Sequence, residues 1–179
     1  EIVRMKRKKN TFVSRAAVGC VTTAIFLLLC IIKGIYPFGI ATLDTVDFQS
    51  QWIPAYYHVW DVLHGDGSAF FDWRVGGGNN FAGVSAQFSL FSPFNLFFLF
   101  VKRSWIEKSM IVFLLIKLLA MGYGMRWFLK EQILKEERYG IYILAGSVGY
   151  AVNGYTLLYY GMGWLDVAAI LPLLCYFFC

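Results

Sequence analysis

Residues 16–32 read AAVGCVTTAIFLLLCII, an apolar stretch without a charged side chain. Extended through Lys33 to Tyr36, it reaches the length of about 20 residues that a helix needs to cross the hydrocarbon core of a bilayer. Lys33 can extend its ammonium group to the membrane surface, and Pro37 is expected to end the helix because proline lacks an amide hydrogen. The stretch therefore predicts a first membrane span over residues 16–36.

A cluster of cations precedes this stretch: Arg4, Lys6, Arg7, Lys8, Lys9 and Arg15. Positive charges beside a span favour the cytoplasmic side, so we expect the N-terminus inside the cell. A basic segment before an apolar core is also typical of a signal peptide, but no clear small-x-small cleavage site follows and more apolar segments come later. The cations lead directly into lipid-compatible sequence, which argues against a nucleic-acid-binding face.

The composition supports the membrane class, since 59% of the 179 residues are hydrophobic whereas soluble domains are about half apolar. The four cysteines lie inside apolar runs and show neither a zinc-binding spacing nor a disulfide framework. We expect an all-α polytopic membrane protein with a single transmembrane domain. Because the apolar run that ends the sequence is too short to span a bilayer, we also expect a fragment of a longer protein.

Three further apolar segments are expected to be spans, at residues 110–129, 139–160 and 167–179, the last of them truncated. Glycines in the second of these segments, Gly146, Gly149 and Gly154, are expected to allow close contacts between helices. Residues 37–109 between the first two spans form a long extracytoplasmic loop, whose many aromatic side chains suit helices lying at the membrane surface.

The apolar run at residues 88–101 is ambiguous, because it is only about 14 residues long and contains Ser92 and Pro93. We interpret it as an interfacial or re-entrant element, which places the charged linker at residues 130–138 in the cytoplasm. If this run instead crossed the membrane, the orientation of every later segment would be inverted. Three cations count against the interfacial or re-entrant interpretation: Lys102, Arg103 and Lys108. We adopt it because it puts Asp166 outside, where Asp47 already lies.

Five motifs follow one another along the chain: Asp47-x-Gln49-x-Gln51-Trp52-x-Pro54, Trp73-Arg74-x-Gly76-x-Gly78-x-Asn80, Phe91-Ser92-Pro93-Phe94-Asn95-Leu96, Lys117-Leu118, and Trp164-Leu165-Asp166 with Leu171-Pro172-Leu173. In this order they resemble the N-terminal part of the bacterial YfhO membrane protein family. That family is similar to the GT-C glycosyltransferases, multi-pass enzymes that take a sugar from a polyprenyl-phosphate donor on the outer face of the membrane.

The resemblance implies GT-C-like N-terminal helices in the bacterial plasma membrane and an acceptor in the cell envelope, such as teichoic acid. It also implies one acidic residue in the first outer loop and a second in the next, which match Asp47 and Asp166. The chemistry needs a base for the proton of the acceptor hydroxyl, and the headgroup layer raises the basicity of a carboxylate. From local sequence alone, Asp47 could equally cap the following helix.

Five residues are candidates for substrate binding: Gln51, Arg74, Asn80, Lys117 and Trp164. Arg74, Lys117 and the amides of Gly76 to Gly78 could stabilise the departing phosphate, although the glycine run could also be a plain turn. A charge inside a span costs on the order of 3 kcal/mol, so Lys117 should face an anion or a polar cavity. Alternatively, Lys117 extends outward or pairs with a carboxylate from another helix. Trp164 could stack on a sugar or anchor a helix end.

His58, Asp61 and His64 follow one another at intervals of three, and with Asp44 and Asp47 they could form a divalent-cation site. Interfacial helices often carry such polar faces, and the GT-C class contains members with and without a metal ion. The need for a cofactor stays open at this point. Two other classes would share these features, namely a transporter or flippase of lipid-linked sugars and a non-catalytic scaffold of the cell envelope.

Overall fold

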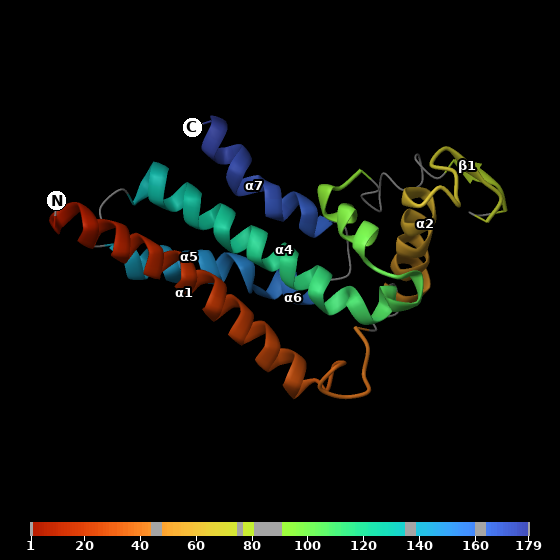
Figure 1. Ribbon diagram of the computed structural model, residues 1–179, viewed down its shortest axis with the longest axis horizontal. Helices are drawn as coiled ribbons and strands as arrows, with labels where there is room; N and C mark the ends of the chain where they lie inside the picture. Colours follow the sequence, from red (N-terminus) through yellow and green to blue (C-terminus); the bar gives the residue numbers. More distant parts are fainter. Residues whose placement is uncertain are drawn as a thin grey trace.

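The computed structural model describes residues 2–43, 48–74, 77–80, 91–134, 139–159 and 164–178, with side chains from residue 15 onward. The longest elements are α1 (Ile2–Ile32), α4 (Ile106–Phe128), α5 (Gly140–Ala151) and α7 (Trp164–Phe178), and the short helix α6 (Gly154–Leu158) follows α5. Together they form a bundle in which α4 packs against α1, α5 and α7 (Figure 1). The other helices are thus arranged around α4.

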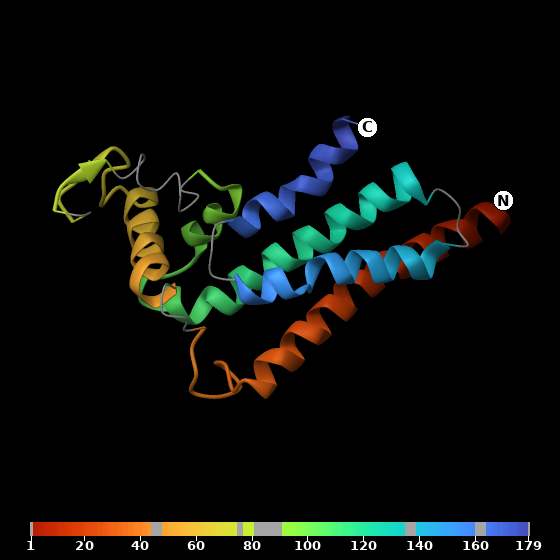
Figure 2. The same ribbon diagram turned by 180° about the vertical axis from the view of Figure 1, so that it is seen from behind.

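Successive helices of the bundle alternate in direction. Seen from both sides, α1 and the α5–α6 pair run one way while α4 and α7 run the other way (Figures 1 and 2). The C-terminal end of α1, the N-terminal end of α4 and the N-terminal end of α7 therefore lie at the same end of the bundle. We call it the loop end and mark it by Ile32, Ile106 and Trp164.

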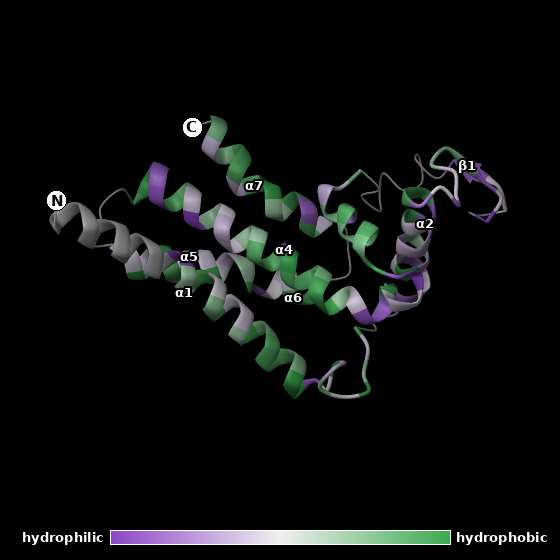
Figure 3. Cartoon of the chain, viewed as in Figure 1, coloured by the Kyte–Doolittle hydropathy of each residue, from purple (hydrophilic) through white to green (hydrophobic). Residues whose placement is uncertain are grey.

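Three helical segments are long and apolar enough to cross a membrane: Arg15–Ile32, Arg103–Ile133 and Gly140–Leu158. Trp164–Phe178 is a shorter apolar helix. Apolar residues predominate along these helices, whereas many hydrophilic residues lie in the segments at the loop end (Figure 3). The described chain is mostly helical, in agreement with the expected all-α membrane class.

The first helix ends earlier than the sequence predicted, at Ile32 instead of Tyr36. Gly34 adopts a left-handed φ of 62°, and the amide of Ile35 donates to the carbonyl of Cys30 at 2.9 Å. Glycine takes this conformation without steric cost and closes the last turn. The prediction that Pro37 ends the helix is therefore wrong, because Gly34 already does so.

The third expected span contains a break between α5 and α6. The side-chain oxygen of Asn153 accepts a hydrogen bond from the amide of Thr156, and the Thr156 hydroxyl accepts one from the amide of Asn153, both at 3.0 Å. Asn153 Nδ2 also donates to the carbonyl of Tyr150 at 2.7 Å. A helix break inside an apolar layer needs such partners, because lipid offers none to the freed backbone groups.

Close helix contacts occur at Gly122, in the C-terminal half of α4. A β-carbon at this position would lie 3.3 Å from Val18 Cγ1 of α1 and 3.6 Å from Ala151 Cβ of α5. Absence of a side chain lets the three helices approach one another. Gly122 is thus the point where α1 and α5 both meet the central helix.

The glycines expected to make close contacts in the third span behave differently from one another. The prediction is right for Gly146, where a β-carbon would lie 2.9 Å from Leu129 Cδ1. It is wrong for Gly149 and Gly154, because no atom of the described part of the chain lies within 4 Å of a β-carbon there. A side chain at either of these two positions would meet open space within the described part of the chain.

The long first loop is folded against the loop end of the bundle. A π-helical turn, η1 (Phe48–Trp52), leads into α2 (Ile53–Leu63), and the strands β1 (Phe71–Asp72) and β2 (Asn79–Asn80) form an antiparallel hairpin beyond it. Two 3-10 helices follow, η2 (Pro93–Phe100) and η3 (Arg103–Trp105), and a second π-helical turn, η4 (Leu129–Ile133), continues α4. The hairpin projects beyond α2, away from the bundle (Figure 1).

The described part of the ambiguous run at residues 88–101 contains η2, which is eight residues long and contacts α2 and α4. Residues 88–90 lie outside the described part. Ser92 caps η2, since its hydroxyl accepts a hydrogen bond from the amide of Phe94 at 3.2 Å. Pro93 occupies the first position, where its missing amide hydrogen costs nothing.

Three aromatic rings join the loop to the bundle. The ring of Tyr56 in α2 lies 5.3 Å from that of Phe98 in η2 and 5.4 Å from that of Phe113 in α4, and the two phenylalanine rings are 5.0 Å apart. All three side chains are buried. Aromatic side chains bury large areas and add specific ring contacts, so the loop and the bundle share one hydrophobic core.

Candidate functional site

The central polar contact of the bundle joins Lys117 in α4 to Asp166 in the first turn of α7. Lys117 Nζ lies 2.6 Å from Asp166 Oδ1, and the two side chains are only 2% and 8% exposed. Among the alternatives that the sequence left open for Lys117, the structure shows pairing with a carboxylate from another helix. Each charge offsets the other, which an apolar interior requires of buried ions.

Aromatic side chains surround this pair. The ammonium of Lys117 lies 4.4 Å from the ring centroid of Phe113 and 5.8 Å from that of Phe94 in η2, within the range of cation–π attraction. Burial, with a smaller contribution from the negative charge of Asp166, raises the pKa of Tyr56, so the phenol stays neutral. We call Lys117, Asp166 and these three rings the paired-charge site.

Asp47, the candidate base, lies outside the described residues, as does Asp44. The residues on either side of this short segment, Leu43 and Phe48, are both buried in the hydrophobic cluster that also contains Leu165. Both ends of the segment are therefore anchored in the core that holds the first turn of α7. A common site for Asp47 and Asp166 stays a prediction.

The remaining substrate-binding candidates differ in their positions. Gln51 is exposed in η1, and Asn80 is exposed in β2, on the hairpin that projects beyond α2. Trp164 begins α7 and is 46% exposed, with its ring 6.2 Å from that of Tyr159. Trp164 is thus at the same end of α7 as Asp166, whereas the hairpin carries Asn80 away from the bundle.

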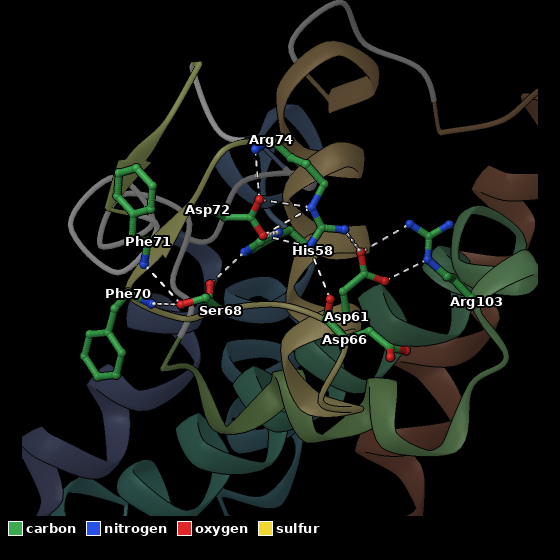
Figure 4. Close-up of polar contacts among 9 residues, drawn as sticks. All are labelled: His58, Asp61, Asp66, Ser68, Phe70, Phe71, Asp72, Arg74 and Arg103. Atoms are coloured by element: carbon green, nitrogen blue, oxygen red, sulfur yellow. Dashed lines mark hydrogen bonds and ion pairs between the residues drawn. The ribbon is translucent and has the colours of Figure 1, made fainter.

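Arg74 belongs to a second polar cluster, in the loop, where carboxylates already hold it. Its Nη1 lies 3.0 Å from Asp61 Oδ2, and its Nη2 lies 2.7 Å from Asp72 Oδ2. Arg103 of η3 approaches the other oxygen of Asp61, at 2.8 Å. Figure 4 shows Asp61 between the two guanidinium groups. With His58, these residues form what we call the outer-loop network.

Electrostatics keeps both carboxylates of this network ionised. The hydrogen bond from Arg103, together with the attraction of both arginines, lowers the pKa of Asp61 below its ordinary value. Hydrogen bonds from Arg74 lower the pKa of Asp72 further. A general base or acid needs a pKa near the working pH. The outer-loop network therefore suits a structural role that ties α2, β1 and η3 together.

The histidines considered for a metal site have other partners. His58 Nε2 lies 3.1 Å from the carbonyl of Ser68, and Nδ1 lies 3.7 Å from Asp72 Oδ2. His64 stacks on Trp60, with ring centroids 3.8 Å apart. In the ranges that the structure describes, which exclude Asp44 and Asp47, no three histidine, cysteine or acidic side chains are grouped as metal ligands would be.

Two of the cations that counted against the expected orientation are held by protein groups. Arg103 pairs with Asp61 and lies 5.0 Å from the ring centroid of Tyr57. Lys108 lies 5.7 Å from the ring of Tyr36 and 5.5 Å from that of Trp105. The positive-inside rule counts cations beside a span, but the charge of Arg103 is offset locally. Nothing in the sequence indicated this partner, which comes from another part of the loop.

Sequence reasoning missed the aromatic residues of the paired-charge site. Tyr56, Phe94 and Phe113 come from α2, η2 and α4. Phe94 belongs to one of the five motifs, but nothing in the local sequence distinguishes Tyr56 and Phe113 from the many other aromatic residues. A usable signal existed for the ion pair itself. Lys117 and Asp166 are both charged residues within apolar segments, and such charges tend to find each other.

Comparison with known proteins identifies one family. The family described as bacterial membrane protein YfhO matches residues 19–176. This range contains the helices from the middle of α1 to α7, including both residues of the ion pair. No curated protein and no solved structure matches the chain.

Proposed function

The chain belongs to the bacterial membrane protein family YfhO, and on this premise we propose that it is a membrane glycosyltransferase of the GT-C type. It moves a sugar from a polyprenyl-phosphate donor to a cell-envelope acceptor, such as teichoic acid. The reaction takes place on the outer face of the bacterial plasma membrane, towards which the loop end points, and the N-terminus is cytoplasmic.

The observation that best supports this proposal is the ion pair between Lys117 and Asp166 at 2.6 Å. A buried pair often contributes little to stability compared with apolar residues of similar size, so a role in chemistry would account for it better. Its acidic member lies in the first turn of α7, at the loop end. That end also holds the loop on which the other candidate acid, Asp47, is located.

In the proposed reaction, an oxygen of the acceptor hydroxyl attacks the anomeric carbon of the donor sugar, and the bond from that carbon to the phosphate oxygen breaks. Asp47 takes the proton of the hydroxyl, and the electron pair of the broken bond stays on the polyprenyl phosphate. Lys117 stabilises the negative charge of the departing phosphate. Asp166 keeps Lys117 charged and oriented until the donor binds.

The test is sugar transfer by the full-length protein in vesicles, with a radiolabelled sugar on polyprenyl phosphate as donor. Asp47→Asn should abolish transfer and leave donor binding unchanged, because the amide cannot accept the proton. Asp66→Asn is the matched control, since Asp66 is an exposed acidic residue of the same loop. Full transfer by Asp47→Asn would remove Asp47 from the mechanism.

A transporter or flippase of lipid-linked sugars is the second candidate, because buried charges inside membrane proteins often mark substrate pathways. Such a protein would move the labelled donor across the vesicle membrane without passing the sugar to an acceptor. It would also stop when a helix is cross-linked in place. A non-catalytic scaffold would tolerate Asp47→Asn in both assays.

A further inference from the structure

A groove of about 430 Å³ lies between α1, α4 and α6 on the flank of the bundle. Its walls are mainly apolar and include Phe26 and Cys30 of α1, Leu114 and Leu118 of α4, and Leu157 of α6. The volume is within the range of about 300–1,000 Å³ that is typical of small-molecule sites. Because all three helices belong to candidate membrane spans, the groove lies at the depth of lipid chains.

The groove has a charged lining residue at one end. Phe26, Cys30 and Lys33 all line it, and they follow one another along α1 towards the loop end. Lys33 is exposed, and within the described ranges no ion pair joins it to a carboxylate. The groove thus offers hydrocarbon along its length and a positive charge at its end.

The segment that carries Asp47 begins directly beside this charged end. Thr42 and Leu43 line the groove, and Leu43 is the last described residue before residues 44–47. A ligand with its chain in the groove and its head at Lys33 would therefore present that head to the loop on which the candidate base lies.

We propose that this groove binds the part of the polyprenyl chain nearest to the phosphate before transfer, with Lys33 as the first cation that the phosphate meets and Lys117 as the cation that stabilises its charge when the sugar leaves. The inference rests on the proposed function and names the donor's binding site. Lipid tails are as apolar as leucine, so the walls alone cannot select one lipid from the bilayer. Selection comes from the cation at the end and from the shape of the groove, which a branched isoprenoid chain fills differently from a straight acyl chain.

The experiment measures binding, not transfer, in the full-length protein. The probe is a photoreactive polyprenyl monophosphate without a sugar, in vesicles of phosphatidylethanolamine and phosphatidylglycerol. Ala41→Trp fills the groove from its exposed lining residue Ala41 and should reduce labelling by about tenfold or more. Lys33→Gln should reduce it by about fivefold, because one cation near an anionic lipid group contributes modestly.

Matched controls use the same changes away from the groove. Leu28 is 56% exposed on α1 and does not line the groove, so Leu28→Trp should leave labelling unchanged. Lys102→Gln removes an exposed cation near η3 and should also have no effect. A photoreactive amino acid at position 41 gives a second readout, since it should capture the same lipid in the otherwise unaltered protein.

Three results would overturn the inference: normal labelling of Ala41→Trp, equal competition by an excess of phosphatidylglycerol, or capture by position 41 of another segment of the chain. The second would assign the groove to ordinary phospholipid, and the third to a neighbouring helix. Failure of the proposed function would give a different result. Labelling would still depend on the groove, but the unaltered protein would transfer no sugar. Normal transfer by Ala41→Trp would refute the groove and leave the enzyme class intact.

Discussion

Lys117 and Asp166 form an ion pair of 2.6 Å between the central helix and the last described helix of the bundle. They meet because α4 and α7 run side by side in the same direction. The ring of Phe94 in η2 lies 5.8 Å from the ammonium of Lys117, and Tyr56 of α2 packs on Phe113, the other ring beside this ammonium. The ion pair thus joins two helices of the bundle, and the neighbouring rings connect it to the loop that is expected to carry the chemistry.

The first prediction concerns the stability of this pair. Lys117→Met alone should lower the free energy of unfolding by about 3–5 kcal/mol, because it leaves the carboxylate of Asp166 buried without a partner. The double variant Lys117→Met with Asp166→Leu should recover most of this loss. Thermal unfolding of the full-length protein in detergent measures both.

Sugar transfer separates stability from function in the same variants. We expect the double variant to be stable and inactive, since it lacks the cation for the departing phosphate. An active double variant would show that the pair is structural only. Equal destabilisation by the single and double variants would mean that the charge of Asp166 is compensated by other groups.

The second prediction concerns the sidedness of the loop end. A cysteine at Ser104, in η3, should react with a membrane-impermeant thiol reagent from outside the cell. A cysteine at Leu134, after η4, should react only in permeabilised cells. The four native cysteines are replaced first. The opposite pattern would put Asp166 in the cytoplasm and rule out the proposed reaction on the outer face.

The third prediction concerns helix packing at Gly122. Gly122→Leu should cost about 1–3 kcal/mol, because the new side chain would collide with Val18 of α1 and Ala151 of α5. Gly149→Ala is the matched control at an open position of α5, where replacing glycine should stabilise the helix by up to about 1 kcal/mol. Similar unfolding temperatures for the two variants would contradict the observed crossing.

The fourth prediction concerns the pH dependence of the outer-loop network. The pKa values of Asp61 and Asp72 are lowered in the folded protein, so their stabilising effect is present above the ordinary carboxylate pKa of about 3.9. It is lost as the pH falls through the lowered pKa values, because protonation removes the partners of the arginines. Hydrogen exchange of the hairpin, corrected for intrinsic rates, should be constant from about pH 7 to 5 and rise only below about pH 4.

A substitution gives an independent check of the same network. Asp61→Asn removes the charge between Arg74 and Arg103, so the hairpin should exchange faster already at neutral pH. Asp66→Asn, with an exposed side chain, should not change it. If the exchange of wild-type hairpin amides rises near neutral pH, a group other than these two aspartates controls the loop.

The sequence alone determined the membrane class and the family, because both depend on features that neighbouring residues carry. An apolar stretch such as residues 16–32 has its length and composition whatever it later contacts. The five motifs resembled one family, and the match over residues 19–176 confirms that resemblance. Lys117 also stood out from sequence, since a charge inside a span must be compensated by something.

Only the tertiary structure decided what compensates each charge. Asp166, Asp61 and the ring of Phe94 reach their partners through the packing of separate helices, and that packing leaves no mark in the local sequence. The break at Asn153 and the end of α1 at Gly34 were likewise hidden inside apolar runs. Hydrophobicity is a sum over a segment, whereas an ion pair depends on the positions of two atoms, and those positions exist only once the helices have packed.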